Sequence, residues 1–115
     1  MPLLKIHTTV NVSDDKKGKL LTDASRIVAE TTGKPEKYVM VVLEAGDILM
    51  GGAAGAAAFL DVRGIGGLNK TVNGKLTKSL CELLRRELAI DPARVYATFT
   101  DVAAQNWGCN GATFG

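Results

Sequence analysis

The stretch that decides the fold is Pro2-Leu-Leu-Lys-Ile-His-Thr-Thr-Val10, because its pattern returns in the second half of the chain. Apolar and polar side chains alternate along it, which predicts a β-strand with Leu4, Ile6 and Thr8 on one side and Leu3, Lys5 and His7 on the other. Phe59-Leu-Asp-Val-Arg63 repeats Leu3-Leu-Lys-Ile-His7 at an offset of 56 residues (59 minus 3). The chain is therefore expected to contain an internal repeat.

A helix is predicted after each of these strands. In the first half, Ser13 is a candidate N-cap, an apolar stripe follows (Leu20, Leu21, Ala24, Ile27 and Val28), and Gly33 ends the helix. The second half has Leu76, Leu80, Leu83 and Leu84 at the same offset. A second strand follows each helix. The segment that starts at Pro92 mirrors the one that starts at Pro35, at an offset of 57 (92 minus 35).

Two tandem β-α-β units predict an α+β fold of two layers, with a four-stranded sheet that carries both helices on one face. Residues 1–115 form a single domain. Tyr38–Leu43 is apolar on both sides and is interpreted as a central strand that is covered on both faces. No element of the chain remains to cover the second face, so we expect a homo-oligomer whose copy number the pattern leaves open.

Composition excludes several functional classes. The net charge is only +2 and no basic run is present, which argues against nucleic-acid binding. No segment reaches the roughly 20 apolar residues that cross a bilayer, and no leader pattern is visible, so we expect a cytoplasmic protein away from membranes. Cys81 and Cys109 form no CxxC, and no His, Cys, Asp and Glu cluster has metal-ligand spacing. We expect neither a metal nor a cofactor.

Two glycine-rich segments and the single histidine allow more than one interpretation. The segment 51–58 predicts a surface turn, with a close subunit contact as the alternative. The segment 63–70 predicts a tight turn, with a backbone cradle for an anion as the alternative, and it has no nucleotide-binding pattern. His7 has no partner indicated nearby and is expected to be solvated or packed.

Pro2 is a candidate base if Met1 is removed, since the new terminus would be a secondary amine at the start of a strand. A free α-amino group titrates near pH 7.7–8.0, and burial or a nearby cation lowers its pKa. Such a base suits proton transfer next to a carbonyl group. A proline in the second position is common, so this feature alone does not indicate an enzyme.

Over essentially its whole length, the chain resembles the macrophage migration inhibitory factor family of the tautomerase superfamily. The resemblance is carried by Met1-Pro2, Thr32-Gly-Lys-Pro35, Ile65-Gly-Gly67, Asp91-Pro-Ala-Arg-Val-Tyr96 and Asn110-Gly-Ala-Thr-Phe114. It implies a homotrimer whose three sheets form a barrel, with active sites at the subunit interfaces. It also implies an isomerase that tautomerises small aromatic α-keto acids, with phenylpyruvate and dopachrome as model substrates.

The resemblance also implies roles for individual residues. Pro2 matches the proline that transfers the proton, and Lys34 the lysine that binds the substrate carboxylate and lowers the pKa of the proline. Ile65 matches an isoleucine whose backbone amide meets the substrate, and Tyr96 a tyrosine from the neighbouring subunit. Tyr38 and Phe114 match hydrophobic pocket residues.

The chain departs from the family pattern at three pocket positions. Thr98 replaces a common asparagine, Cys109 replaces a tail tryptophan, and Trp107 stands where a valine is common. Substrate preference is therefore expected to differ. The CxxC of animal members is absent, so no thiol–disulfide activity is carried over.

Two other interpretations also fit the sequence. A ferredoxin-like module that binds a small ligand or a protein would show antiparallel pairing between the strands that flank each helix. An oligomer retained for its interaction surface would have vestigial catalysis.

Overall fold

The computed structural model describes all of residues 1–115 and contains two copies of one β-α-β unit, as predicted. The copies comprise β1 (Pro2–Thr8), α1 (Asp14–Thr32) and β2 (Met40–Ala45), then β3 (Ala58–Gly64), α2 (Lys70–Leu88) and β4 (Val95–Asp101). Strands β1 and β3 start 56 residues apart (58 minus 2), and so do the two helices (70 minus 14).

The short 3₁₀ turns before β2 and β4 keep the same spacing. They are η1 (Glu36–Tyr38) and η2 (Pro92–Arg94), whose first residues are also 56 apart (92 minus 36). The offset of 57 taken from the two prolines is therefore wrong. Pro35 precedes η1, whereas Pro92 is the first residue of η2.

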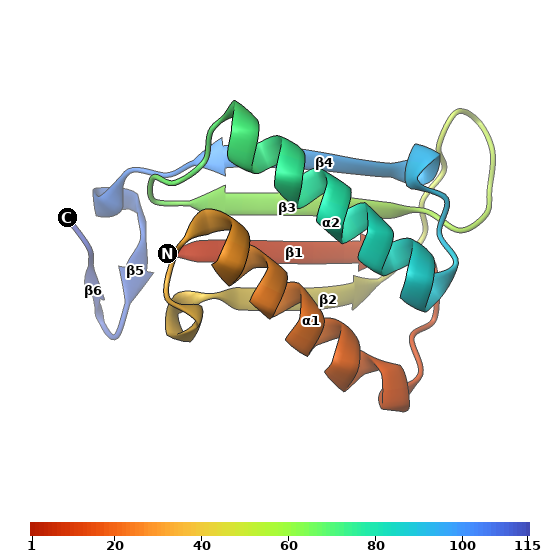
Figure 1. The fold of residues 1–115 in the computed structure, drawn as a ribbon, viewed down its shortest axis with the longest axis horizontal. Coiled ribbons are helices and arrows are strands. Elements are labelled where there is room, and N and C mark those ends of the chain that lie inside the picture. Colours follow the sequence, from red (N-terminus) through yellow and green to blue (C-terminus); the bar gives the residue numbers. More distant parts are fainter.

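The four strands form one sheet in the order β2-β1-β3-β4, and both helices cover the same face (Figure 1). The pairs β1–β2 and β3–β4 are parallel, and the two units join through the antiparallel pair β1–β3. The α+β prediction is confirmed. The parallel pairs contradict the ferredoxin-like alternative, which requires antiparallel strands beside each helix.

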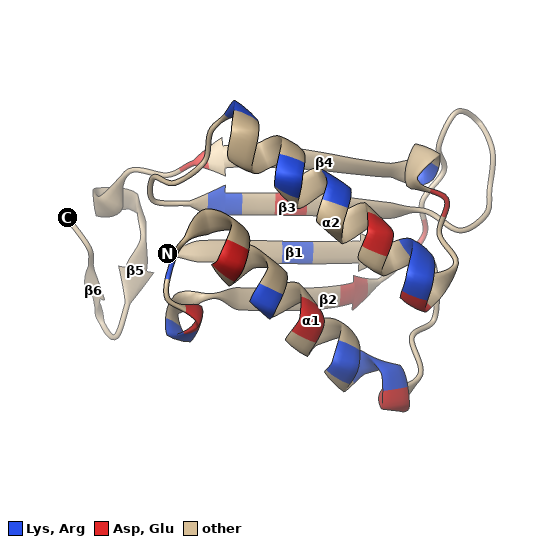
Figure 2. Cartoon of the chain, viewed as in Figure 1, with Lys and Arg blue, Asp and Glu red and all other residues tan.

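The core lies between the sheet and the helices. Leu4 and Ile6 of β1 are fully buried, as predicted, and so is Thr8, whose hydroxyl donates a 2.9 Å hydrogen bond to the Ala57 carbonyl. The helices contribute buried apolar side chains at Leu20, Ala24, Val28, Leu76, Leu80, Leu83 and Leu84. Charged residues of both signs recur along both helices (Figure 2). Neither helix is long and apolar enough to cross a membrane.

The prediction of a central strand at Tyr38–Leu43 is wrong. Strand β2 is an edge strand that begins at Met40, and Tyr38 belongs to the preceding 3₁₀ turn. Val41 and Leu43 pack against the core, while Met40 is 61% exposed on the opposite side. The apolar run therefore reflects one packed side and one exposed side of an edge strand.

The uncovered face of the sheet is more polar than the sequence suggested. Glu44 of β2 lies 3.3 Å from the Lys5 ammonium and 3.5 Å from Nδ1 of His7. Arg63 pairs with Asp61 at 3.0 Å on the same face. The expectation that His7 lacks a partner is wrong, because parallel pairing places Glu44 beside it. Large apolar side chains are also exposed on this face (Met40, Phe59 and Tyr96), so the expected homo-oligomer stays a prediction.

The last residues form a small hairpin beside the N-terminal end of β1 (Figure 1). A turn η3 (Ala104–Asn106) leads into β5 (Gly108–Cys109) and β6 (Ala112–Thr113). The two turn residues between these strands, Asn110 and Gly111, both have positive φ (52° and 81°), which is typical of tight hairpin turns. The hairpin therefore forms a wall next to Pro2.

Candidate active site

A hollow of about 360 Å³ lies at the N-terminal end of β1. Three parts of the chain line it: the first residues, the segment from η1 into β2, and the C-terminal hairpin. Its lining residues are Met1, Pro2, Leu3, Lys37, Tyr38, Val39, Met40, Trp107, Gly108, Cys109 and Phe114. Residues 102–115 contain no Asp, Glu, Lys or Arg, so the wall formed by the tail has no charged side chain (Figure 2).

Four of the predicted site residues meet in this hollow. Pro2 is buried and pairs with Gly64 across the antiparallel β1–β3 ladder, which fixes its backbone. Tyr38 reaches the hollow from η1, and Trp107 and Phe114 reach it from the tail. The Phe114 amide donates a 3.1 Å hydrogen bond to the Trp107 carbonyl, which holds the two aromatic residues together. These side chains form an apolar chamber next to Pro2.

Lys34 is close enough to the N-terminus to affect its charge. Burial is the first cause that lowers the pKa of the Met1 amine below its ordinary value of 8.0, and the positive charge of Lys34 is the second. Lys34 follows Gly33, which ends α1 in the left-handed conformation at φ 72°. Its amide also donates a 3.3 Å hydrogen bond to the Thr32 hydroxyl. The backbone thus holds Lys34 at the end of α1.

The state of Met1 decides whether Pro2 can act as a base. With Met1 attached, the Pro2 nitrogen is part of an amide, whose lone pair is delocalised into the peptide bond. Removal of Met1 would make that nitrogen the terminal amine. Pro2 is buried, whereas Met1 is only partly buried.

Ile65 lies directly after Gly64, at the end of β3 beside Pro2. The turn that contains it is anchored to the neighbouring strand and the chain that follows it. The Gly66 amide donates a 2.9 Å hydrogen bond to the Asp101 carboxylate, and the Val102 amide donates to the Gly64 carbonyl at 2.8 Å. These two hydrogen bonds hold the turn that contains the Ile65 amide.

Tyr96 and Thr98 do not reach the hollow of their own chain. Pro2 pairs with Gly64, which pairs with Asp101, whereas Tyr96 lies five residues earlier on β4. At about 3.3 Å per residue this is roughly 16 Å along the sheet. Tyr96 is 67% exposed there. Within one chain, the site lacks the tyrosine that the resemblance implies.

Among the lining residues that the sequence analysis did not assign to the site, two carry a reactive or charged group, Lys37 and Cys109. Lys37 places its ammonium 4.9 Å from the centre of the Tyr38 ring, at the hollow itself. Its place next to an aromatic pocket residue was the available signal. Cys109 was noted only as a departure from the family pattern, and it lines the same wall as Trp107.

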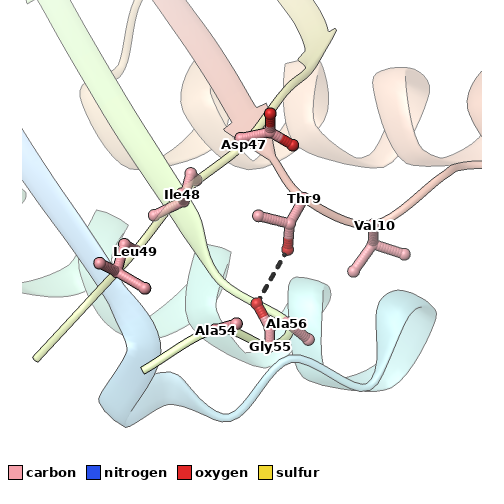
Figure 3. Close-up of a pocket in the computed structure, with 8 residues that line it drawn as sticks. All are labelled: Thr9, Val10, Asp47, Ile48, Leu49, Ala54, Gly55 and Ala56. Atoms are coloured by element: carbon pink, nitrogen blue, oxygen red, sulfur yellow. Dashed lines mark hydrogen bonds between the residues drawn. The ribbon is translucent and has the colours of Figure 1, made fainter. Parts of the chain in front are cut away.

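A larger hollow of about 750 Å³ lies at the opposite end of the sheet, near the loop between β2 and β3. Figure 3 shows its small and apolar lining and the hydrogen bond from the Thr9 hydroxyl to the Gly55 carbonyl, 3.2 Å long. Asp47 is its only ionisable residue. Its volume exceeds that of the hollow at Pro2, but none of the residues predicted for the active site lines it. No three metal-binding side chains gather anywhere in the structure.

The comparisons decide the family. The family model for macrophage migration inhibitory factor matches residues 1–115. The chain belongs to the macrophage migration inhibitory factor family. A family member from Xenopus laevis is 34% identical over 99% of both chains. The solved structure of the homologue from Prochlorococcus marinus is 34% identical, with a TM-score of 0.93 over 98% of this chain and 99% of that chain.

A solved structure with a lower sequence identity has the same fold. A protein solved after inactivation by 2-oxo-3-pentynoate has a TM-score of 0.85 over 96% of this chain and 94% of its own. At 24% identity, that likeness concerns the fold alone. The family resemblance inferred from the sequence motifs is thus confirmed, as membership of the macrophage migration inhibitory factor family.

Proposed function

We propose that this chain, once Met1 has been removed, is a keto–enol tautomerase of small aromatic α-keto acids, with phenylpyruvate and dopachrome-type compounds as model substrates. One observation carries the proposal. The N-terminus lies in an apolar hollow beside Pro2, where burial and the charge of Lys34 lower the pKa of the terminal amine. An amine that is uncharged near neutral pH can accept a proton from carbon.

The proposed reaction needs only one proton and no oxidant. The uncharged Pro2 nitrogen removes a proton from the carbon next to the ketone. The electron pair of that C–H bond forms the carbon–carbon double bond, and the carbonyl pair moves to oxygen. The protonated Pro2 then returns the proton to that oxygen. The reverse sequence gives the keto form, so Pro2 acts first as base and then as acid without a cofactor.

Each of the other side chains has a part in this reaction. The Lys34 ammonium binds the substrate carboxylate and supports the negative charge that builds up on the oxygen, in a chamber where few waters screen it. The Ile65 amide donates to the substrate. The rings of Tyr38, Trp107 and Phe114 pack against the aromatic group of the substrate.

The proposal includes a homotrimer whose subunits share each active site. Tyr96 lies too far from Pro2 of its own chain, so a neighbouring chain would have to supply it. Sedimentation equilibrium tests this part. Three chains of 12.1 kDa give about 36 kDa, whereas a mass of 12.1 kDa would exclude a shared site. We also place the protein in the cytoplasm, where initiator methionine is removed.

Turnover of phenylpyruvate from enol to keto form tests the proposal. Intact mass must first establish that Met1 is absent. The wild-type protein is compared with Pro2→Gly, with Lys34→Ala and with a form that keeps one extra glycine before Pro2. We expect full turnover by the wild type, reduced turnover by Lys34→Ala, and little by Pro2→Gly or the extended form. Wild-type turnover no faster than that of the extended form would refute Pro2 as the base.

A further inference from the structure

Lys34 and Gly67 meet at the edge of the site, although they are distant in sequence. A Cβ atom placed on Gly67 would lie 2.9 Å from Cε of Lys34 and 3.7 Å from its Nζ. The first distance is shorter than a side-chain carbon tolerates. The Lys34 side chain therefore crosses the space that any side chain at position 67 would occupy.

Both partners are held in place by other parts of the structure. The Lys34 backbone is fixed between the cap residue Gly33 and Pro35, whose φ is −58°. The turn with Gly67 is tied down through the hydrogen bond from Gly66 to Asp101. Since both backbones are held, a side chain at position 67 would have to displace the side chain of Lys34.

We infer that Gly67 is a positioning residue, whose bare backbone gives the Lys34 side chain the only path that brings its ammonium to the substrate carboxylate. This inference rests on the proposed function for the identity of the ligand. Gly67 itself touches neither substrate nor the reacting atoms. It acts through Lys34.

The neighbouring glycine provides a matched control. Gly66 and Gly67 both have positive φ, 69° and 79°, so alanine introduces similar backbone strain at either position. A Cβ on Gly66 meets no atom within 4 Å, whereas a Cβ on Gly67 meets Lys34. The lysine has a flexible end, so Gly67→Ala would move the ammonium rather than unfold the turn. The two variants differ mainly in their effect on Lys34.

The test compares Gly67→Ala with Gly66→Ala, each alone and combined with Lys34→Ala. A hydrogen bond to a charged group is usually worth enough that its loss raises KM about tenfold or more. We expect this rise in KM for phenylpyruvate with Gly67→Ala, little change in kcat, and KM near the wild-type value with Gly66→Ala. In the Lys34→Ala background, Gly67→Ala should have no further effect beyond that of Gly66→Ala.

A second measurement does not require turnover. NMR titration of the terminal amine reports the influence of Lys34 directly. A displaced ammonium moves into water, which screens it, so the pKa of the amine should rise in Gly67→Ala and stay unchanged in Gly66→Ala. Equal behaviour of the two variants in both KM and pKa would overturn the inference. If the wild type does not turn over any keto acid, the proposed function fails, yet the titration still decides the role of Gly67.

Discussion

Lys34→Ala is the substitution whose effect can be worked out furthest from the structure. Lys34 is partly buried and affects the charge of the amine at the N-terminus. A charged hydrogen bond in such a place contributes about 1.5–3 kcal/mol, which corresponds to a loss of about 10- to 150-fold in kcat/KM. An ion pair in open solvent would contribute at most about 1 kcal/mol, or about fivefold. The size of the loss in kcat/KM therefore shows whether Lys34 acts in a partly buried site or in open solvent.

Lys37→Ala is the matched control, because Lys37 is a second lysine near the N-terminus: it lines the hollow and is exposed, whereas Lys34 is not among the lining residues. We expect its effect to stay within about fivefold. The assay follows phenylpyruvate from enol to keto form at several substrate concentrations, with thermal melting to verify the fold of both variants. If Lys37→Ala lost more activity than Lys34→Ala, Lys37 would be the carboxylate-binding residue and the assignment of Lys34 would be refuted.

Three further predictions concern pH, thiols and the core. The kcat/KM of the Met-free protein should increase with pH and level off above a pKa that lies below 8.0, because only the uncharged amine accepts a proton. A kcat/KM that still increases above pH 8.0 would contradict this. In the native chain, a thiol reagent should modify only the exposed Cys109. Cys81 should react only after unfolding, because it is buried and burial raises its pKa. Fast reaction of both thiols in the native protein would contradict this. In urea unfolding, Leu80→Ala should lower the free energy of unfolding by about 2–5 kcal/mol, because Leu80 is buried. Thr22→Ala, on the exposed side of α1, should lower it by less than about 0.5 kcal/mol. Equal losses would show that Leu80 is not part of the core.

The repeat was predictable because it depends on local spacing. Alternation at Leu4 and Ile6, the helix stripe and the cap at Gly33 each follow from residues close together in the chain. The place of β2 was not predictable in this way. An apolar run has the same composition at the centre of a sheet and at an edge with one packed side, and only the strand order distinguishes the two.

The candidate site shows the same limit. Tyr38 and Phe114 were predicted from the family resemblance, and Trp107 was expected at the pocket as a departure from it; all three line the hollow, whereas the resemblance gave no role to Lys37. The pair His7 and Glu44, and the contact between Lys34 and Gly67, depend on which strands and turns become neighbours. Such contacts join residues more than 30 positions apart, and local patterns do not contain that information.

A single titration tests the central claim most directly. Protein of verified mass, without Met1 and labelled with ¹⁵N in proline, is titrated by NMR while the nitrogen of Pro2 is observed. We predict a pKa below the 7.7–8.0 that is usual for a terminal amine, and a higher value in Lys34→Ala. A nitrogen that stays protonated above pH 8 and ignores the loss of Lys34 would contradict the account of Pro2 as the working base.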